Sequence, residues 1–232
     1  MTNVSNLAER RNLPGDRLRE RVQEHYDWLV AKGETDEARK YISTVRALHT
    51  QARTDGHTQV LNKDGFREQA PGIVAKAAQY GKPLALFGID FDGFKGVNDE
   101  RGYRGPNGQR VMGHPGGDLL IADGFNVFRQ SVRAGDLVAR MGGDEAVALL
   151  YDITPEEAVS MAGRLSNRFQ QRTGETISIG IVAYERTPSD ETLQRLINRA
   201  DEASYVAKEH KDRVMKAALW TPSRKVEILR SA

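Results

Sequence analysis

The sequence of 232 residues contains no cysteine, which excludes disulfide bonds, thiolate metal sites and cysteine nucleophiles. It has no apolar run near the roughly 20 residues that span a bilayer, and its N-terminal segment lacks a hydrophobic signal core. The net charge of +2 is too small to indicate nucleic-acid or membrane binding. Hydrophobic residues make up 39% of the chain, enough for a real core. We therefore expect a cytoplasmic globular protein with neither nucleic-acid nor membrane partners.

The first 53 residues form a predicted N-terminal helical region. Between about Asp16 and Arg53, apolar residues recur at helical spacing on both sides of a polar break at Gly33. This pattern predicts a helical hairpin. The hairpin either packs on the main domain or dimerises the protein, and the pattern favours neither.

Residues 54–216 form a predicted main domain in which helices alternate with short β-rich runs. We expect helices at 64–79, from near 117, at 155–171 and at 192–208, and strands at 83–90, 136–141, 144–150 and 176–184. The order β-α-β-β-α-β predicts an α+β fold with a ferredoxin-like, palm-type antiparallel sheet and helices on one face. The tail, 217–232, is expected to be irregular or briefly helical.

Two glycines, Gly142 and Gly143, separate two strand-like runs and predict a tight hairpin, because glycine supplies the positive φ that such a turn needs. The acidic pair Asp144 and Glu145 follows them directly. This pair therefore lies at the start of the second hairpin strand.

A second acidic cluster ends the strand at 83–90, where alternation puts Asp90 and Asp92 on the same side. If this strand neighbours the hairpin, three or four carboxylates converge at one edge of the sheet. Hard oxygen ligands of this kind suit Mg²⁺, which completes its shell with waters and substrate phosphates. Either cluster alone is equally typical of solvated strand ends, so the metal prediction depends on both.

A short polar segment follows the first acidic cluster. Its Lys95 is suited to neutralising a polyphosphate, and the Asn98-Asp99 pair is suited to reading a base edge. An Asn-Asp pair near glycine is also typical of a turn.

Taken together, these segments resemble the GGDEF family over residues 54–216. The matching stretches are TDGHTQVLNKDGF, GIDFDGFKGVND, GHPGGDLL, MGGDEA and ADEASYVAKEHKDRV. The resemblance implies a diguanylate cyclase, which joins two GTP molecules into cyclic di-GMP and releases pyrophosphate. It also implies Mg²⁺ or Mn²⁺ as cofactor, two ions per active site, and a homodimer in which each subunit binds one GTP.

The resemblance also implies roles for individual residues. It makes Asp144 the proton acceptor and a catalytic residue together with Glu145 and Lys95. The implied metal ligands are Asp90, the Phe91 carbonyl, Asp144 and Glu145. The implied substrate-binding residues are Asn98 and Asp118, which contact guanine, His114, and Lys208 and Lys211, which contact the triphosphate. The glycine that the family has before Lys211 is missing here.

The segment Arg133–Asp136 lies just upstream of the signature loop, at the spacing of the family's RxxD inhibitory site. The resemblance implies that cyclic di-GMP binds there as a feedback inhibitor. Arginine can pair with phosphate or guanine, and aspartate can hold a second guanine. An Arg and an Asp three residues apart are also commonplace where a helix meets a strand.

Two departures from the family stand out. Ala146 replaces the phenylalanine that ends the signature, and we expect this position to be a packing residue. Residues 100–112 stand where the family normally has two residues, an insertion of about eleven. This Gly- and Arg-rich segment is a surface insertion, a lid that supplies Arg104 or Arg110 to phosphate, or a mark of altered substrate use.

Alternative functions stay open at this point. A degenerate GGDEF module would bind GTP or cyclic di-GMP as a receptor or regulatory domain. A related cyclase or polymerase would make a different nucleotide product, although Asp118 favours guanine. A third alternative is a helical interaction protein with an inert domain.

Overall fold

The computed structural model describes residues 15–209, 216–222 and 227–229, and the chain divides into two compact units, 1–52 and 53–232. In the first unit, α2 (Gly15–Ala31) and α3 (Thr35–Arg53) form the predicted hairpin. The two helices meet through the His25 and Tyr41 rings, whose centroids are 4.6 Å apart. Among the helices in the described ranges, none has the length and hydrophobicity needed to cross a bilayer.

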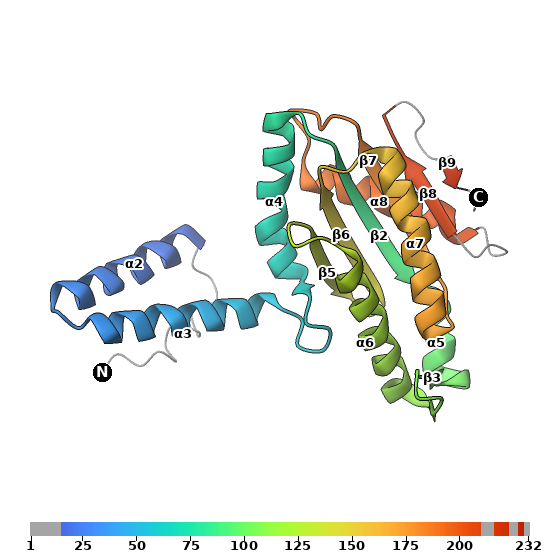
Figure 1. Ribbon diagram of the computed structural model, residues 1–232, viewed down its shortest axis with the longest axis horizontal. Coiled ribbons are helices and arrows are strands. Elements are labelled where there is room, and N and C mark those ends of the chain that lie inside the picture. Colours follow the sequence, from blue (N-terminus) through green and yellow to red (C-terminus); the bar gives the residue numbers. More distant parts are fainter. Residues whose placement is uncertain (1–14, 210–215, 223–226, 230–232) are drawn as a thin grey trace. The chain divides into compact units, whose positions relative to one another are not determined.

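The second unit is an α+β domain built on a seven-stranded sheet with the order β1-β5-β6-β2-β7-β8-β9 (Figure 1). Its strands are β1 (Leu61–Asn62), β2 (Leu84–Phe91), β5 (Leu137–Gly142), β6 (Glu145–Tyr151), β7 (Ile177–Tyr184), β8 (Lys216–Trp220) and β9 (Glu227–Leu229). Its helices are α4 (Lys63–Tyr80), α5 (Phe94–Gly96), the π-helical turn η1 (Val97–Arg101), α6 (Gly113–Ser131), α7 (Pro155–Thr173) and α8 (Leu193–Glu209).

Local sequence signals explain where the longest helices begin and end. Helix α7 starts with a capping box, in which the Thr154 side chain accepts from the Glu157 N–H and the Glu157 side chain accepts from the Thr154 N–H. Pro155 occupies the first helical position, and Gly174 ends the helix in the left-handed conformation. The predicted helix at 155–171 is therefore confirmed.

The core has two layers, one on each face of the sheet. Side chains of α6 and α7 pack on one face, around Phe91, Phe125 and Phe169. Side chains of α4 and α8 pack on the other, around Phe66 and Leu196. Figure 1 shows α6 and α7 in front of the strands. Strand β2 lies in the middle and is buried almost throughout, which explains its continuous apolar sequence.

The α+β class, the flanking helices and the antiparallel centre of the sheet confirm the predicted fold, but two details differ. Helices cover both faces rather than one. The sheet is also mixed, because β1 runs parallel to β5 and β8 runs parallel to β7. The expectation of an irregular or briefly helical tail is wrong, since β8 extends the sheet beside β7 and pairs with β9.

The insertion folds as a small hairpin of its own, made of β3 (Tyr103–Arg104) and β4 (Arg110–Val111). Tyr103 anchors it: its side chain is fully buried and its hydroxyl donates to Asp123 of α6, 2.8 Å away. The segment is therefore a packed element of the domain.

Candidate active site

The two acidic clusters meet where β2 ends beside the β5–β6 hairpin. Asp90 of β2 lies opposite Glu145 of β6 in the register. Gly142 pairs with Glu145, so the turn consists of Gly143 and Asp144, one residue later than expected. Gly143 has a positive φ of 30°, which a glycine adopts without strain. The Phe91 N–H donates to the Asp144 carbonyl at 3.3 Å, which ties the turn to the end of β2.

Asp90, Asp144 and Glu145 meet at one edge of the sheet as expected, but within the described ranges no group of three or more His, Cys, Asp or Glu side chains lies close enough to hold a metal ion. Asp92 is held on β7, where it accepts from the hydroxyls of Thr176 and Ser178, each at 2.7 Å. Glu145 is exposed. The carboxylate whose charge acts on Asp144 is that of Asp90.

The electrostatics around Asp144 favour a bound cation. Partial burial is the main cause that raises the pKa of Asp144, and the negative charge of Asp90 raises this pKa further. Lys208 and Arg140 act in the opposite direction but do not cancel the effect. A bound cation would therefore stabilise the charged form of Asp144.

The donor atoms of this pair fit a hard divalent cation. The two carboxylates and the nearby Phe91 carbonyl offer only oxygen, which suits Mg²⁺ or Mn²⁺. Lys208 holds one Asp90 oxygen, with its Nζ at 2.8 Å.

The predicted triphosphate lysines have different surroundings. Lys208 pairs with Asp90, so contact with a triphosphate requires it to leave that carboxylate. Lys95 is exposed on α5, directly after β2. Lys211 lies outside the described residues.

The predicted guanine-binding residues gather where η1 meets the first turns of α6. The Asn98 side-chain oxygen is buried and has no hydrogen-bond partner among the described residues. It sits against Gly117, where an added Cβ would overlap that oxygen and come within 2.9 Å of the Asn98 Cγ. His114 and Asp118 are exposed on the same turns of α6. A buried amide oxygen without a donor is costly in a folded protein, so a donor that reached it would stabilise this position.

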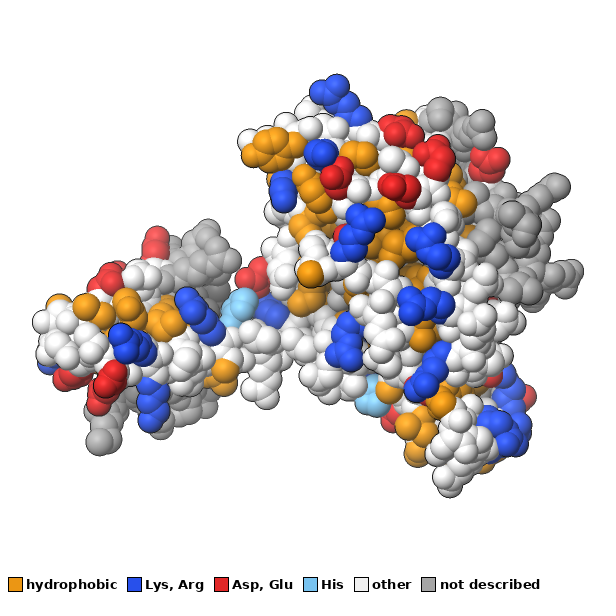
Figure 2. Space-filling model, in the orientation of Figure 1, with side chains coloured by type: hydrophobic (Ala, Val, Ile, Leu, Met, Phe, Trp, Pro, Cys, Tyr) orange, Lys and Arg blue, Asp and Glu red, His pale blue; other side chains and the backbone are white. Residues whose placement is uncertain are grey.

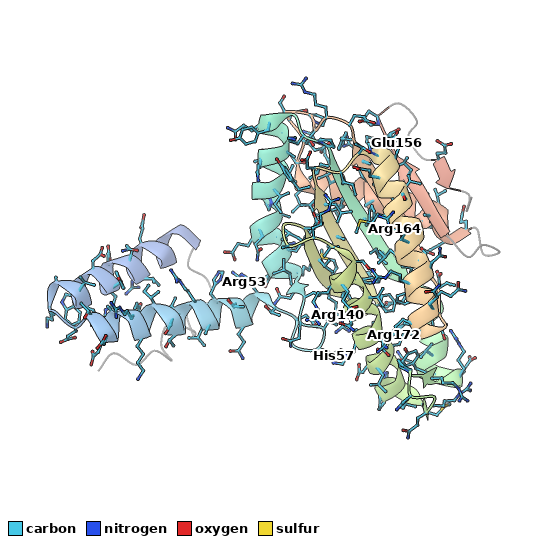
Figure 3. All side chains as sticks on the ribbon, viewed as in Figure 1. Arg53, His57, Arg140, Glu156, Arg164 and Arg172 are labelled. Atoms are coloured by element: carbon cyan, nitrogen blue, oxygen red, sulfur yellow. The ribbon has the colours of Figure 1, made fainter. Side chains whose placement is uncertain are left out.

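Two side chains that support this region were not identified from the sequence. The His57 Nε2 donates to the Asp118 carbonyl at 2.7 Å and so fixes the start of α6 (Figure 3). Arg140 donates from Nε to the Gly143 carbonyl at 3.0 Å and from Nη1 to Asp55 at 3.5 Å. The only signal for His57 was its departure from the family pattern.

The predicted inhibitory residues form a turn before β5. The Asp136 carboxylate accepts from the N–H groups of Arg133 at 2.9 Å and Tyr151 at 3.1 Å, which fixes the turn against β6. The Arg133 side chain is exposed. Both residues line a pocket of about 440 Å³ that also includes Arg164 and Glu156 of α7 (Figure 3). Ala146 is buried on β6, as expected for a packing residue.

Comparison with known proteins identifies the family. A family model described as "Diguanylate cyclase, GGDEF domain" matches residues 52–213. The probable diguanylate cyclase DgcT of Escherichia coli K12 is 33% identical over 178 residues, a match that covers 72% of this chain and 36% of DgcT. The chain thus spans about a third of the length of that curated relative.

Solved structures agree on the fold. The coiled coil and GGDEF domain of DgcB from Caulobacter crescentus, solved with c-di-GMP, matches with a TM-score of 0.64 at 22% identity, covering 80% of this chain and 94% of that one. A sensory box/GGDEF family protein from Caulobacter crescentus CB15 matches with a TM-score of 0.57 at 29% identity, covering 68% of this chain and 98% of that one. With the family model covering most of its length, the chain belongs to the GGDEF domain family.

Proposed function

We propose that this chain is a diguanylate cyclase that condenses two GTP molecules into cyclic di-GMP and two pyrophosphates in the cytoplasm. The observation that carries the proposal is the pair of Asp90 and Asp144, two carboxylates whose mutual repulsion a cation would relieve. The buried Asn98 oxygen, which lies against Gly117 and has no hydrogen-bond partner among the described residues, supports it. The names of relatives such as DgcT support the same activity.

In this proposal each residue acts on one part of the nucleotide. Asn98, His114 and Asp118 hold guanine, and the carboxylate of Asp118 accepts from its N–H donors, which adenine does not present in the same pattern. Lys95, Lys208 and Lys211 hold the triphosphate.

Asp144 accepts the proton of the 3′-hydroxyl, and its raised pKa makes it a stronger base than an ordinary aspartate. Asp90, the Phe91 carbonyl, Asp144 and Glu145 would hold Mg²⁺ or Mn²⁺, two ions per site. When bound, such ions lower the pKa of a coordinated hydroxyl and screen the charge of departing pyrophosphate.

The reaction joins two nucleotides, so we propose that the active form is a homodimer with one GTP held by each subunit. The N-terminal hairpin is the candidate element for bringing subunits together, and it exposes the large apolar side chains Trp28, Val30 and Leu48. Cyclic di-GMP would inhibit the enzyme by binding at Arg133 and Asp136, where it would restrain the dimer.

A second candidate function is a receptor that binds GTP or cyclic di-GMP without catalysis. The ion pair between Lys208 and Asp90 favours it, because it occupies an oxygen that a metal ion would use.

The two functions are separated by incubating the purified chain with GTP and Mg²⁺ and identifying products by mass spectrometry, with Asp144→Ala in parallel. The cyclase predicts cyclic di-GMP from the unmodified chain and none from Asp144→Ala, although both bind GTP. A dimeric preparation that binds GTP but makes no product would establish the receptor. ATP in place of GTP serves as the control for base selection.

A further inference from the structure

The inserted hairpin has one apolar face and one basic face. Tyr103 and Val111 lie opposite each other in the register, and Tyr103 is buried against α6. The other pair is Arg104 opposite Arg110, and both side chains are exposed. Side chains directly opposite on antiparallel strands point to the same side, and like charges in that position repel each other. The hairpin therefore places two like charges side by side, and an anion between them would relieve their repulsion.

These two arginines line a pocket of about 300 Å³ between the hairpin and the C-terminal end of α7. Arg101, at the end of η1, and Arg172, in the last turn of α7, complete its basic lining. Figure 2 shows Lys and Arg side chains gathered over the hairpin, and Figure 3 shows Arg172 at the end of α7 nearest to it. The pocket volume is at the lower end of the range for small-molecule sites.

The acidic groups nearby neutralise only two of the four arginines in this lining. Glu175 is the only acid that lines the pocket within the described residues, and it pairs with Arg101 at 2.6 Å. Arg172 pairs with Asp123 at 2.7 Å. Arg104 donates to the Gly108 carbonyl, which carries no charge. The carbonyl end of α7 adds only a partial negative charge. The charges of Arg104 and Arg110 are therefore not balanced by the acids named above, and two arginine charges are suited to binding a polyphosphate group.

We propose that this pocket is a binding site for a small polyphosphate anion, either free pyrophosphate or the diphosphate end of a nucleotide. The guanidinium groups of Arg104 and Arg110 would bind its oxygens, and the anion would remove the repulsion between them. None of the residues assigned to metal or GTP lines this pocket. The site is therefore separate from the one proposed for catalysis.

The test is isothermal titration calorimetry of the full chain with sodium pyrophosphate, and in a second arm with ADP, in a buffer with EDTA and no divalent metal. Neither probe is a substrate of the proposed reaction, so the result does not depend on catalysis. We expect one pyrophosphate per chain and an affinity at least ten-fold lower in the Arg104→Ala/Arg110→Ala double variant. If ADP binds and the Arg104→Ala/Arg110→Ala variant loses affinity for ADP to the same extent, nucleotides are identified as ligands. If only pyrophosphate binds, the ligand is the free anion.

The matched control is Arg67→Ala, because Arg67 is an exposed arginine on α4 that does not line the pocket. Its affinity for pyrophosphate should stay within two-fold of the unmodified chain. If the double variant fails to fold, Arg110→Ala alone replaces it, since this exposed side chain can be truncated without opening the core. Absence of binding by both probes, or equal binding by the unmodified chain and the hairpin variant, overturns the proposal.

Discussion

Replacing Gly117 by alanine should weaken GTP binding while leaving the fold intact. An added Cβ at this position overlaps the Asn98 side-chain oxygen and approaches the Phe94 ring to 3.1 Å. The Asn98 side-chain oxygen makes no hydrogen bond to the described residues, so the amide group can move without breaking a hydrogen bond through that oxygen. The substitution therefore displaces the amide from its position against α6.

The magnitude follows from the interactions that Asn98 would make with guanine. Two neutral hydrogen bonds at about 0.5–1.5 kcal/mol each correspond to a loss of about 1–3 kcal/mol, or about 5- to 150-fold in the Kd of GTP. The helix gains up to about 1 kcal/mol when alanine replaces glycine, which offsets the crowding at Phe94. The free energy of unfolding should thus change by less than about 1 kcal/mol.

The assay is fluorescence titration with a labelled GTP analogue, combined with urea unfolding. Gly72→Ala is the matched control, because Gly72 is an exposed helical glycine on α4 with no atom within 4 Å of an added Cβ. A double-mutant cycle supplies the decisive result: in an Asn98→Ala background, Gly117→Ala should have almost no further effect on binding. An equal loss of affinity in both backgrounds would refute the role given to Asn98.

Three further predictions concern charge, packing and feedback. Asp144→Asn should raise the free energy of unfolding at pH 7, because burial and Asp90 raise the pKa of Asp144 and so disfavour its charged form. The gain should vanish below about pH 4, where the carboxyl is protonated in the unfolded state as well. Urea unfolding across this pH range checks the prediction, and a variant that is less stable than the unmodified chain at pH 7 contradicts it. Tyr103→Phe removes the hydroxyl that donates to Asp123, and it should lower the free energy of unfolding by about 1–2 kcal/mol without changing GTP affinity. An unchanged free energy of unfolding would show that the hydroxyl does not anchor the hairpin. Arg133→Ala should raise the concentration of cyclic di-GMP that halves activity by at least ten-fold with no loss of stability, and inhibition as strong as in the unmodified chain argues against this site.

The sequence was sufficient to predict the elements with strong local signals. Helix α7 has a cap, a proline at its start and a glycine at its end, and it lies within two residues of its prediction. Strand β2 is a continuous apolar run because both of its faces are covered. These elements are specified by residues close together in the chain.

The elements that were missed depend on distant partners. Strand β8 forms by pairing with β7, and nothing within its own five residues distinguishes it from an irregular tail. Strands β3 and β4 have two residues each, too few for an alternating pattern, and they are held by the contact between Tyr103 and Asp123. Pairing of this kind is a tertiary effect that local preference does not encode.

The candidate site divides in the same way. Asp90 and Asp144 could be brought together from the topology, because a strand end and a neighbouring hairpin turn share one edge of the sheet. Two contacts in the site could not be predicted: the hydrogen bonds from two hydroxyls at β7 to Asp92, and the ion pair between Lys208 and Asp90. Both depend on the positions of side chains that lie far apart in the chain.

The most direct test of the central claim is a time course that measures cyclic di-GMP by mass spectrometry and pyrophosphate by an enzymatic assay in the same reaction. With GTP and Mg²⁺, the unmodified chain should release two pyrophosphates for each cyclic di-GMP formed, and EDTA or Asp144→Ala should stop both. Absence of both products from dimeric, GTP-binding protein, or equal product formation by Asp144→Ala, would contradict the assignment of catalysis to Asp90 and Asp144.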